Sequence, residues 1–179
     1  VTPASGTEQN FTGPVTYRVG DITYTVTLTV KVPAFMEKGS EIDPYIINSA
    51  EKLLALSKEY NANPNKYKGK YWKQTVDIDM SDVLQDVKFT PIGTTTAFSG
   101  FYDGDNRKIK NLTISSGAEE VGLFGNVTDG SILKNIVIDE SCRISGSAAG
   151  CNIGALAGRV GGASTIENCT SYATVTSNA

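Results

Sequence analysis

Two carboxylates in the middle of the chain have a spacing that could support catalysis. Asp77 and Asp79 are separated by one residue, so on a β-strand they would share one face and lie roughly 6.6 Å apart. Paired carboxylates several ångströms apart carry out glycoside hydrolysis. A polysaccharide lyase would need a base beside a neutralising arginine, but the chain has no histidine and its few arginines are scattered. We therefore expect both aspartates to be solvated or to cap a turn.

A second acidic segment resembles the start of a calcium loop. Residues 103–106 are Asp-Gly-Asp-Asn, and alternating oxygen side chains of this kind can converge on a calcium ion. Such a loop ends in glutamate at its twelfth position, which here is Ile114. A tight turn is the better interpretation, and we predict no cofactor. Calcium bound by Asp103 and Asp105 is the alternative.

Aromatic side chains among lysines form a candidate glycan contact. Tyr67, Tyr71 and Trp72 lie next to Lys70 and three further lysines. Exposed aromatic rings can stack on sugar faces, and lysines could attract an acidic polysaccharide. The competing interpretation is that these rings cover one end of the core, which is the more common environment of large aromatic side chains.

The three cysteines cannot all be paired with one another. Cys142 and Cys151 flank residues 143–150, and a disulfide between them would close that segment. Cys169 has the parity of a buried position and is expected to be an inert thiol. A metal site is not expected, because histidine is absent and the cysteines lack paired ligand spacing.

These residues belong to a sequence that repeats itself. A four-residue pattern occurs at 109–112, 133–136 and 166–169: a hydrophobic residue, a charged residue, asparagine and a further core-facing residue. The second and third copies are farther apart in the sequence than the first and second. Glycine-rich segments at 122–125 and 154–158 each end at the same distance before the next copy. Self-similarity at a fixed period of roughly twenty-odd residues indicates a solenoid, in which one coil stacks on the next.

Side-chain parity indicates the kind of solenoid. Leu112 and Ile114 share one face of a strand, whereas Ile109 has the opposite parity, so the chain must turn between them. Asn111 stands at that turn, and Asn135 and Asn168 stand at the equivalent positions of the other copies. Asparagine tolerates the left-handed backbone region that such a corner needs. We predict an all-β fold, a parallel β-helix, with these three asparagines stacked as a hydrogen-bonded ladder.

Residues 1–33 predict a different β-structure. Two alternating segments surround Gly20-Asp21, which is the signal of a hairpin. They resemble the C-terminal strands of a bacterial immunoglobulin-like module, which needs about seven strands. We expect residues 1–33 to be an incomplete module and residues 34–40 to be a linker. The chain opens as if within a domain, so we also expect a fragment whose export signal is missing.

Residues 41–179 are predicted to form a capped solenoid that is cut short at its C-terminal end. Residues 44–47 predict a short strand, followed by a helix that Asn48 or Ser49 caps and that extends to Tyr60. Leucines and Tyr60 form an apolar stripe at helical spacing, and Pro64 stops the helix. Because the open end of a solenoid exposes its core and unpaired strand edges, we expect this helix to be a cap.

Charge and hydropathy exclude two classes of partner. The net charge is −3 and basic runs are absent, which argues against a nucleic-acid surface. An apolar stretch long enough to cross a membrane is also absent.

Several motifs occur in the order seen in GLUG-repeat proteins, the surface proteins and lipoproteins of Gram-negative bacteria, and residues 154–175 look like a GLUG repeat itself. The matching motifs are Asp43-Pro44-Tyr45-Ile46-Ile47, Tyr67-Lys68-Gly69-Lys70-Tyr71-Trp72, Asp77-Ile78-Asp79-Met80, Thr90-Pro91-Ile92-Gly93, Phe98-Ser99-Gly100 and Tyr102-Asp103-Gly104. One departure is Asp105-Asn106, where the family often has Asn-Gly. The resemblance covers about residues 40–179 and implies a right-handed β-helix at the cell surface, exposed on the outer membrane or anchored through a lipid. It implies no catalytic residues.

We therefore predict a non-enzymatic, adhesin-like surface protein whose β-helix binds a glycan or a host or bacterial surface protein. Two alternatives remain open. One is a polysaccharide lyase or glycoside hydrolase, by analogy of fold alone. The other is a passive stalk without a ligand.

Overall fold

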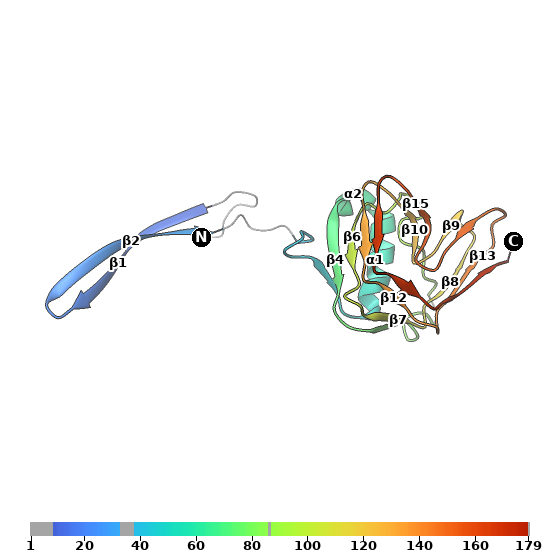
Figure 1. Cartoon of the computed structure of the whole chain (residues 1–179), viewed down its shortest axis with the longest axis horizontal. Coiled ribbons are helices and arrows are strands. Elements are labelled where there is room, and N and C mark those ends of the chain that lie inside the picture. Colours follow the sequence, from blue (N-terminus) through green and yellow to red (C-terminus); the bar gives the residue numbers. More distant parts are fainter. Residues whose placement is uncertain (1–8, 33–37, 86, 179) are drawn as a thin grey trace. The chain divides into compact units, whose positions relative to one another are not determined.

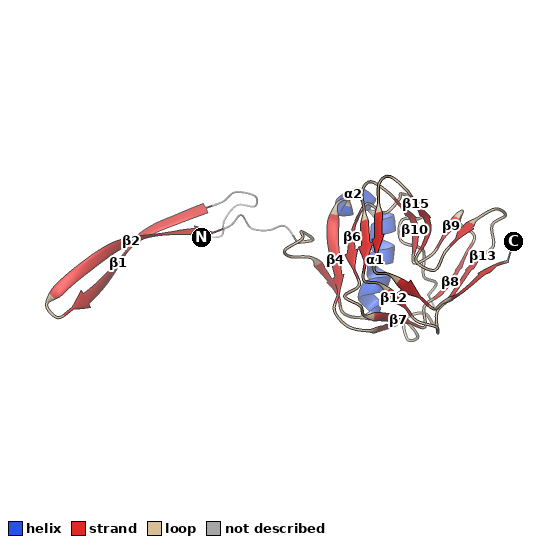
Figure 2. Cartoon of the chain, in the orientation of Figure 1, coloured by secondary structure: helices blue, strands red, loops and turns tan. Residues whose placement is uncertain are grey.

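The computed structural model describes residues 9–32, 38–85 and 87–178. The chain divides into two compact units, Val1–Asp43 and Pro44–Ala179. Figure 2 shows strands throughout both units and helices in the second. Within the described residues the fold is all-β in class, with the helical residues confined to one segment between residues 50 and 67.

The first unit contains the hairpin that the sequence predicts. Strand β1 (Gln9–Val19) pairs antiparallel with β2 (Ile22–Val32), and Val19 lies opposite Ile22. Gly20 and Asp21 form the tight turn between them, with Gly20 in the left-handed region at φ +60°. This is the backbone conformation that tight hairpin turns require. The hairpin is therefore confirmed, while its immunoglobulin-like origin stays a prediction.

The second unit begins with a strand followed by helices. Strand β3 (Tyr45–Ile47) leads to α1 (Ala50–Ala62), whose first turn is capped by the Ser49 hydroxyl accepting the Lys52 N–H. Helix α1 therefore ends slightly beyond Tyr60, where the predicted helix ended. Its C-terminal cap is Asn63, and Pro64 opens the short helix α2 (Pro64–Tyr67). Proline suits a first helical position because its missing N–H is not needed there.

The remaining strands stack in parallel layers (Figure 1). One sheet has the order β16-β11-β6-β4-β3, a second β17-β12-β7-β5, and a third β18-β13-β8, with the shorter pairs β10-β15 and β14-β9 beside them. The strands are β4 (Lys70–Gln74), β5 (Ile78–Asp79), β6 (Gly100–Asp103), β7 (Lys108–Lys110), β8 (Thr113–Ser116), β9 (Glu120–Val121), β10 (Phe124–Val127), β11 (Ile132–Lys134), β12 (Val137–Ile138), β13 (Arg143–Gly146), β14 (Asn152–Ile153), β15 (Ala157–Val160), β16 (Thr165–Glu167), β17 (Thr170–Ser171) and β18 (Thr174–Ser177).

Each layer follows the previous one at a nearly constant interval along the sequence. The paired residues of neighbouring strands show it in all three main sheets: Tyr102 with Leu133 and Ile166, Ile78 with Ile109 and Ile138, and Ile114 with Ile144 and Val175. The chain therefore visits the three main sheets in the same order in each layer, and we call one such passage a coil. The glycine-rich segments also stack, since Phe124 pairs with Ala157.

The core lies inside these layers and continues under α1. Ile109, Leu112 and Ile114 are all buried although their parity changes, and Asn111 between them has φ +54°. The predicted corner is therefore confirmed. At the other end of the core, Leu53 and Tyr60 of α1 are buried. Polar side chains of α1 also reach loop carbonyls, with Ser57 donating to Thr90, Tyr60 to Ala97 and Asn61 to Pro91.

The predicted alignment of the three asparagine motifs agrees only in part with the strand pairing of the structure. Leu133 pairs with Tyr102 and Ile166, whereas Ile109 pairs with Ile138. The copy around Asn111 thus occupies the next corner of the coil, and the spacing between the first two motif copies is not a coil length. Both corners need a left-handed residue between two buried positions, so the same local pattern occurs at both.

The asparagines accordingly form two columns instead of one ladder. Asn168 donates to Asn135 at 3.5 Å, and Asn135 donates to the Asp103 carboxylate at 2.9 Å. Asn111 donates to Asp79 at 2.9 Å at the other corner. All three have φ between +50° and +54°, so their conformational role is the predicted one.

Candidate functional site

The carboxylates singled out in the sequence act as hydrogen-bond acceptors at turns. Asp77 accepts the Lys108 N–H at 2.9 Å and pairs with Lys110 at 3.1 Å. These contacts, the Lys108 N–H first, lower the pKa of Asp77. The pKa of Asp79 is lowered chiefly by the Asn111 amide. A glycosidase acid needs a raised pKa, so the surroundings of this pair do not suit that reaction.

The candidate calcium segment forms a turn. Asp105 and Asn106 are both left-handed, at φ +50° and +56°. Asp103 accepts the Asp105 N–H at 2.9 Å, and its second oxygen lies 3.5 Å from the Lys134 amine. Burial raises the pKa of Asp103, but the Asn135 amide, the Asp105 N–H and Lys134 outweigh burial and leave it lowered. The described residues contain no cluster of three metal-ligating side chains.

Two of the three candidate aromatic residues belong to the core, which corrects their assignment as glycan contacts. Tyr67 is 6% exposed and Trp72 4% exposed. Trp72 stacks on Tyr45 with ring centroids 5.7 Å apart, and Tyr67 donates a hydrogen bond to Glu59. Neither ring can stack on a sugar. The reason is that α1 and α2 cover this end of the sheet, as the competing interpretation expected.

Tyr71 remains at the surface, and the structure gives it a partner that sequence reasoning missed. Tyr71 and Phe101 are aligned in register on β4 and β6, are both partly exposed, and stack at 4.1 Å between centroids. Lys70, beside them, is also partly buried. The alternation of Phe101 with the buried Tyr102 was the available signal for an outward ring.

The lysines near these rings do not form an unpaired basic patch. Lys68 lies 3.2 Å from Asp129, and Lys73 lies 3.5 Å from Asp105. Lys66 lies over the Tyr67 ring at 4.9 Å. With these charges matched, the expected attraction for an acidic polysaccharide is weakened at this surface.

The proposed disulfide is absent, since Cys142 and Cys151 are free thiols, as is Cys169. Cys142 is buried and its thiol lies 3.2 Å from the Ile109 carbonyl, because its side chain points into the core. Cys151 and Cys169 are only partly buried, so Cys169 is less buried than its parity predicted. Burial raises the pKa of the Cys142 and Cys169 thiols, which makes both poor nucleophiles.

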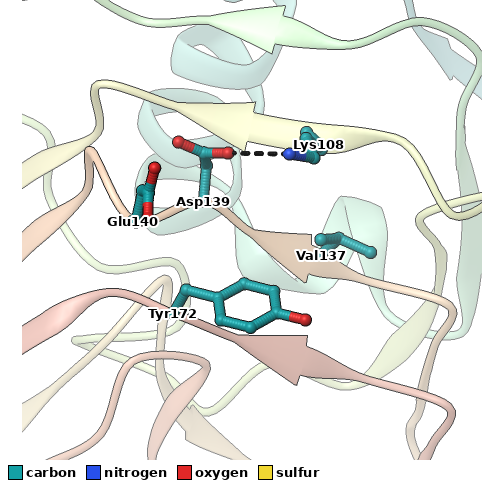
Figure 3. A pocket seen from close by; sticks show the side chains of 5 residues that line it. All are labelled: Lys108, Val137, Asp139, Glu140 and Tyr172. Atoms are coloured by element: carbon teal, nitrogen blue, oxygen red, sulfur yellow. Dashed lines mark hydrogen bonds and ion pairs between the residues drawn. The ribbon is translucent and has the colours of Figure 1, made fainter.

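One candidate site is a groove on the outside of the β17-β12-β7-β5 sheet, which we call the Tyr172 groove. It has a volume of about 350 Å³ and is lined by Lys108, Val137, Asp139, Glu140 and Tyr172. Figure 3 shows these five side chains around a common opening, with the Tyr172 ring on the side opposite the Lys108–Asp139 pair. They come from three successive coils, because Lys108 pairs with Val137 and Val137 with Thr170.

The polar side of the Tyr172 groove is preorganised. Lys108 lies 3.1 Å from one oxygen of Asp139, and the other oxygen accepts the Ser141 N–H and hydroxyl at 3.1 and 2.9 Å. The Ser141 N–H first, and then Lys108, lower the pKa of Asp139. Asp139 in turn raises the pKa of Lys108. Both groups are therefore charged at neutral pH and fixed in position.

Sequence reasoning missed the Tyr172 groove. Its residues lie in separate segments around positions 108, 138 and 172, and they resemble no motif. A correct coil length would have brought them together, because Lys108 on β7 lies opposite Val137 on β12, and Asp139 directly follows β12. The shorter spacing inferred from the first two motif copies obscured this relation.

Comparison with known proteins gives one significant similarity. The chain is 33% identical over 160 residues to "Halomucin" of Haloquadratum walsbyi (strain DSM 16790 / HBSQ001). The match covers 84% of this chain and 2% of that protein, so the chain spans about 2% of the length of the relative it matches. No family model matches the chain. No solved structure matches it either. In the part of the chain that the structure describes, no helix is long and apolar enough to cross a membrane.

Proposed function

We propose that the chain is a non-enzymatic segment of a cell-surface protein, folded as a capped, right-handed parallel β-helix that presents a glycan-binding face. The parallel pairing of strands one coil apart and the left-handed asparagine corners support the β-helix. The burial of Leu53 and Tyr60 at one end of the core supports the capping role of α1. The GLUG-type repeat and the immunoglobulin-like origin of the hairpin belong to the same proposal.

The surface location is supported by the comparison. The name of the relative, "Halomucin", indicates a mucin-like surface protein, which fits the predicted exposure at the outer surface of a cell. Secretion and a lipid anchor are both compatible with this location.

One observation carries the glycan proposal. Outward positions of successive coils lie side by side, and at the Tyr172 groove they combine one exposed aromatic ring, Tyr172, with fixed charged side chains. Sugars offer apolar C–H faces and hydroxyls at their edges, so a site for them needs an aromatic platform next to hydrogen-bonding groups. A flat apolar face would favour a protein partner instead. The lowered pKa values of Asp77 and Asp79 support the non-enzymatic part of the proposal.

The proposal can be tested with the whole chain on a panel of microbial and host polysaccharides. We expect saturable binding to at least one polysaccharide, unchanged by calcium or a chelator, and no release of new sugar ends during incubation. A flat response across the panel would replace the glycan-binding proposal with a passive stalk. New reducing or unsaturated ends would show an enzyme.

A further inference from the structure

We propose that the Tyr172 groove is a subsite for an uncharged pyranose unit of a polysaccharide, with Tyr172 as the stacking platform. This inference rests on the proposed function and names the place and the class of its ligand. It depends on the exposure of one ring, the placement of one ion pair and the net charge of the groove.

Tyr172 supplies an apolar platform in a fixed position. The residue is 65% exposed, while its backbone N–H donates to the Ile138 carbonyl at 2.9 Å. The next residue is also fixed, because the Ala173 N–H donates to the Ser171 hydroxyl at 3.2 Å. A ring on an anchored backbone loses little conformational freedom on binding, since only its own two side-chain torsions must be ordered.

The Lys108–Asp139 pair supplies both hydrogen-bonding functions that a diol requires. Adjacent hydroxyls of a pyranose can donate to a carboxylate with one oxygen and accept from an ammonium with the other. The 3.1 Å separation of the Lys108 amine and the Asp139 oxygen places these two functions side by side. Because Ser141 fixes the other Asp139 oxygen, the pair is oriented before a ligand arrives.

The charge of the groove selects against acidic sugars. Lys108 is matched by Asp139, so Glu140 leaves the lining with one negative charge in excess. No side-chain hydrogen bond or ion pair of Glu140 is found among the residues that the structure describes, and the side chain is exposed. A uronate or sialate carboxylate would meet this charge, whereas an uncharged hydroxyl can donate to it.

The size of the groove agrees with a short stretch of sugar. Its volume of about 350 Å³ lies at the lower end of the ~300–1,000 Å³ found for small-ligand sites. Tyr71 and Phe101, which are partly exposed on the neighbouring sheet, stack on each other at 4.1 Å. Each of those rings therefore already has one face covered.

The experiment is a titration of the whole chain with uncharged oligosaccharides from the polysaccharide that it binds, with polygalacturonate oligomers as the acidic comparison. The variants are Tyr172→Ala, Tyr172→Phe and Glu140→Gln. Tyr71→Ala tests the competing surface. Tyr24→Ala and Glu119→Gln are matched controls, because both residues are exposed and lie outside the groove. Circular dichroism checks that each variant is folded.

We expect Tyr172→Ala to weaken binding by about tenfold or more, because stacking and apolar contact are lost together. Tyr172→Phe should stay within about threefold of the original, since the ring remains. Glu140→Gln should weaken binding of the uncharged oligosaccharides and strengthen binding of polygalacturonate, because it removes the excess negative charge of the groove. The two controls should bind as the unchanged chain does.

Three results would overturn the inference. Binding that survives Tyr172→Ala but is lost in Tyr71→Ala would keep the proposed function and move the site to the Tyr71–Phe101 surface. Stronger binding of polygalacturonate than of uncharged oligosaccharides by the unchanged chain would refute the charge selection. Absence of binding to every polysaccharide would refute the proposed function itself, and the subsite with it.

Discussion

Replacing Asn135 by alanine should lower the free energy of unfolding of the second unit by about 2 kcal/mol. Asn135 stands at the corner between β11 and β12 with φ +54°. Alanine in this left-handed region costs about 1 kcal/mol. The lost hydrogen bond to the Asp103 carboxylate, 2.9 Å long and partly buried, adds about 1 kcal/mol. The 3.5 Å contact with Asn168 is too weak to add much.

The companion variant Asn135→Gly separates the two contributions. Glycine enters the left-handed region without steric cost, so this variant should be less destabilising than alanine by about 1 kcal/mol. Asn65→Ala is the matched control, because Asn65 is exposed in the short helix α2, and it should change stability by less than about 0.5 kcal/mol.

Urea unfolding followed by tryptophan fluorescence is the assay. The chain has one tryptophan, and Trp72 is buried in the second unit, so its emission reports on that unit alone. Asn135→Ala should also lower the melting temperature by about 4–8 °C. Equal stability of Asn135→Ala and Asn135→Gly would refute the argument that the left-handed corner, and not only the hydrogen bond, selects asparagine.

Three further outcomes are expected. Stability should be nearly constant from neutral pH down to about 5 and fall below about 4. The reason is that the pKa of Asp79 is lowered in the folded state, chiefly by the Asn111 amide, and protonation removes that contact. In a series of thermal melts at decreasing pH, Asp79→Asn should lose stability less steeply than the unchanged chain. Cys151 is a free, partly exposed thiol, whereas burial raises the pKa of the Cys142 and Cys169 thiols. Cys151 should therefore react with Ellman's reagent before the two other cysteines, and Cys151→Ser should abolish the fast phase; fewer than three titratable thiols in urea would indicate a disulfide. Gly122→Ala should destabilise by about 1–3 kcal/mol, because a Cβ there would lie 2.7 Å from two carbonyl oxygens, whereas Gly161→Ala, with open space around its Cβ, should be close to neutral in the same urea assay.

Local features of the fold could be predicted from the sequence because they depend on short-range rules. The turn at Gly20 follows from a glycine between two alternating segments. The corner at Asn111 follows from a change of side-chain parity around a residue that tolerates φ > 0. Both need only a few neighbouring residues, so both could be found without knowing how the chain folds back on itself.

The register between coils could not be found in the same way. Two different corners use the same local pattern, so Asn111 and Asn135 look equivalent although Ile109 pairs with Ile138. Only the hydrogen-bonded pairing of the strands distinguishes them, and pairing depends on contacts distant in sequence.

The predictions of site residues were limited in the same way, because burial and grooves also depend on contacts distant in sequence. The burial of Trp72 depends on α1 and α2 covering the sheet, and the Tyr172 groove depends on three coils being in register. Residue type alone identified Trp72 and Tyr71 as aromatic platforms, but it could not distinguish a ring beneath a helix from a ring facing solvent.

The charged side chains aligned across β4, β6, β11 and β16 have a consequence for folding fidelity. Lys73, Asp103, Lys134 and Glu167 occupy one register position on four successive strands, with alternating sign. If β4 skipped one layer and paired with β11, Lys73 would face Lys134, and the same slip by β6 would place Asp103 against Glu167. Like charges directly opposite each other on a sheet are destabilising. The alternation therefore penalises a chain that misses a coil during folding, an error to which repeated sequences are prone because their layers resemble one another.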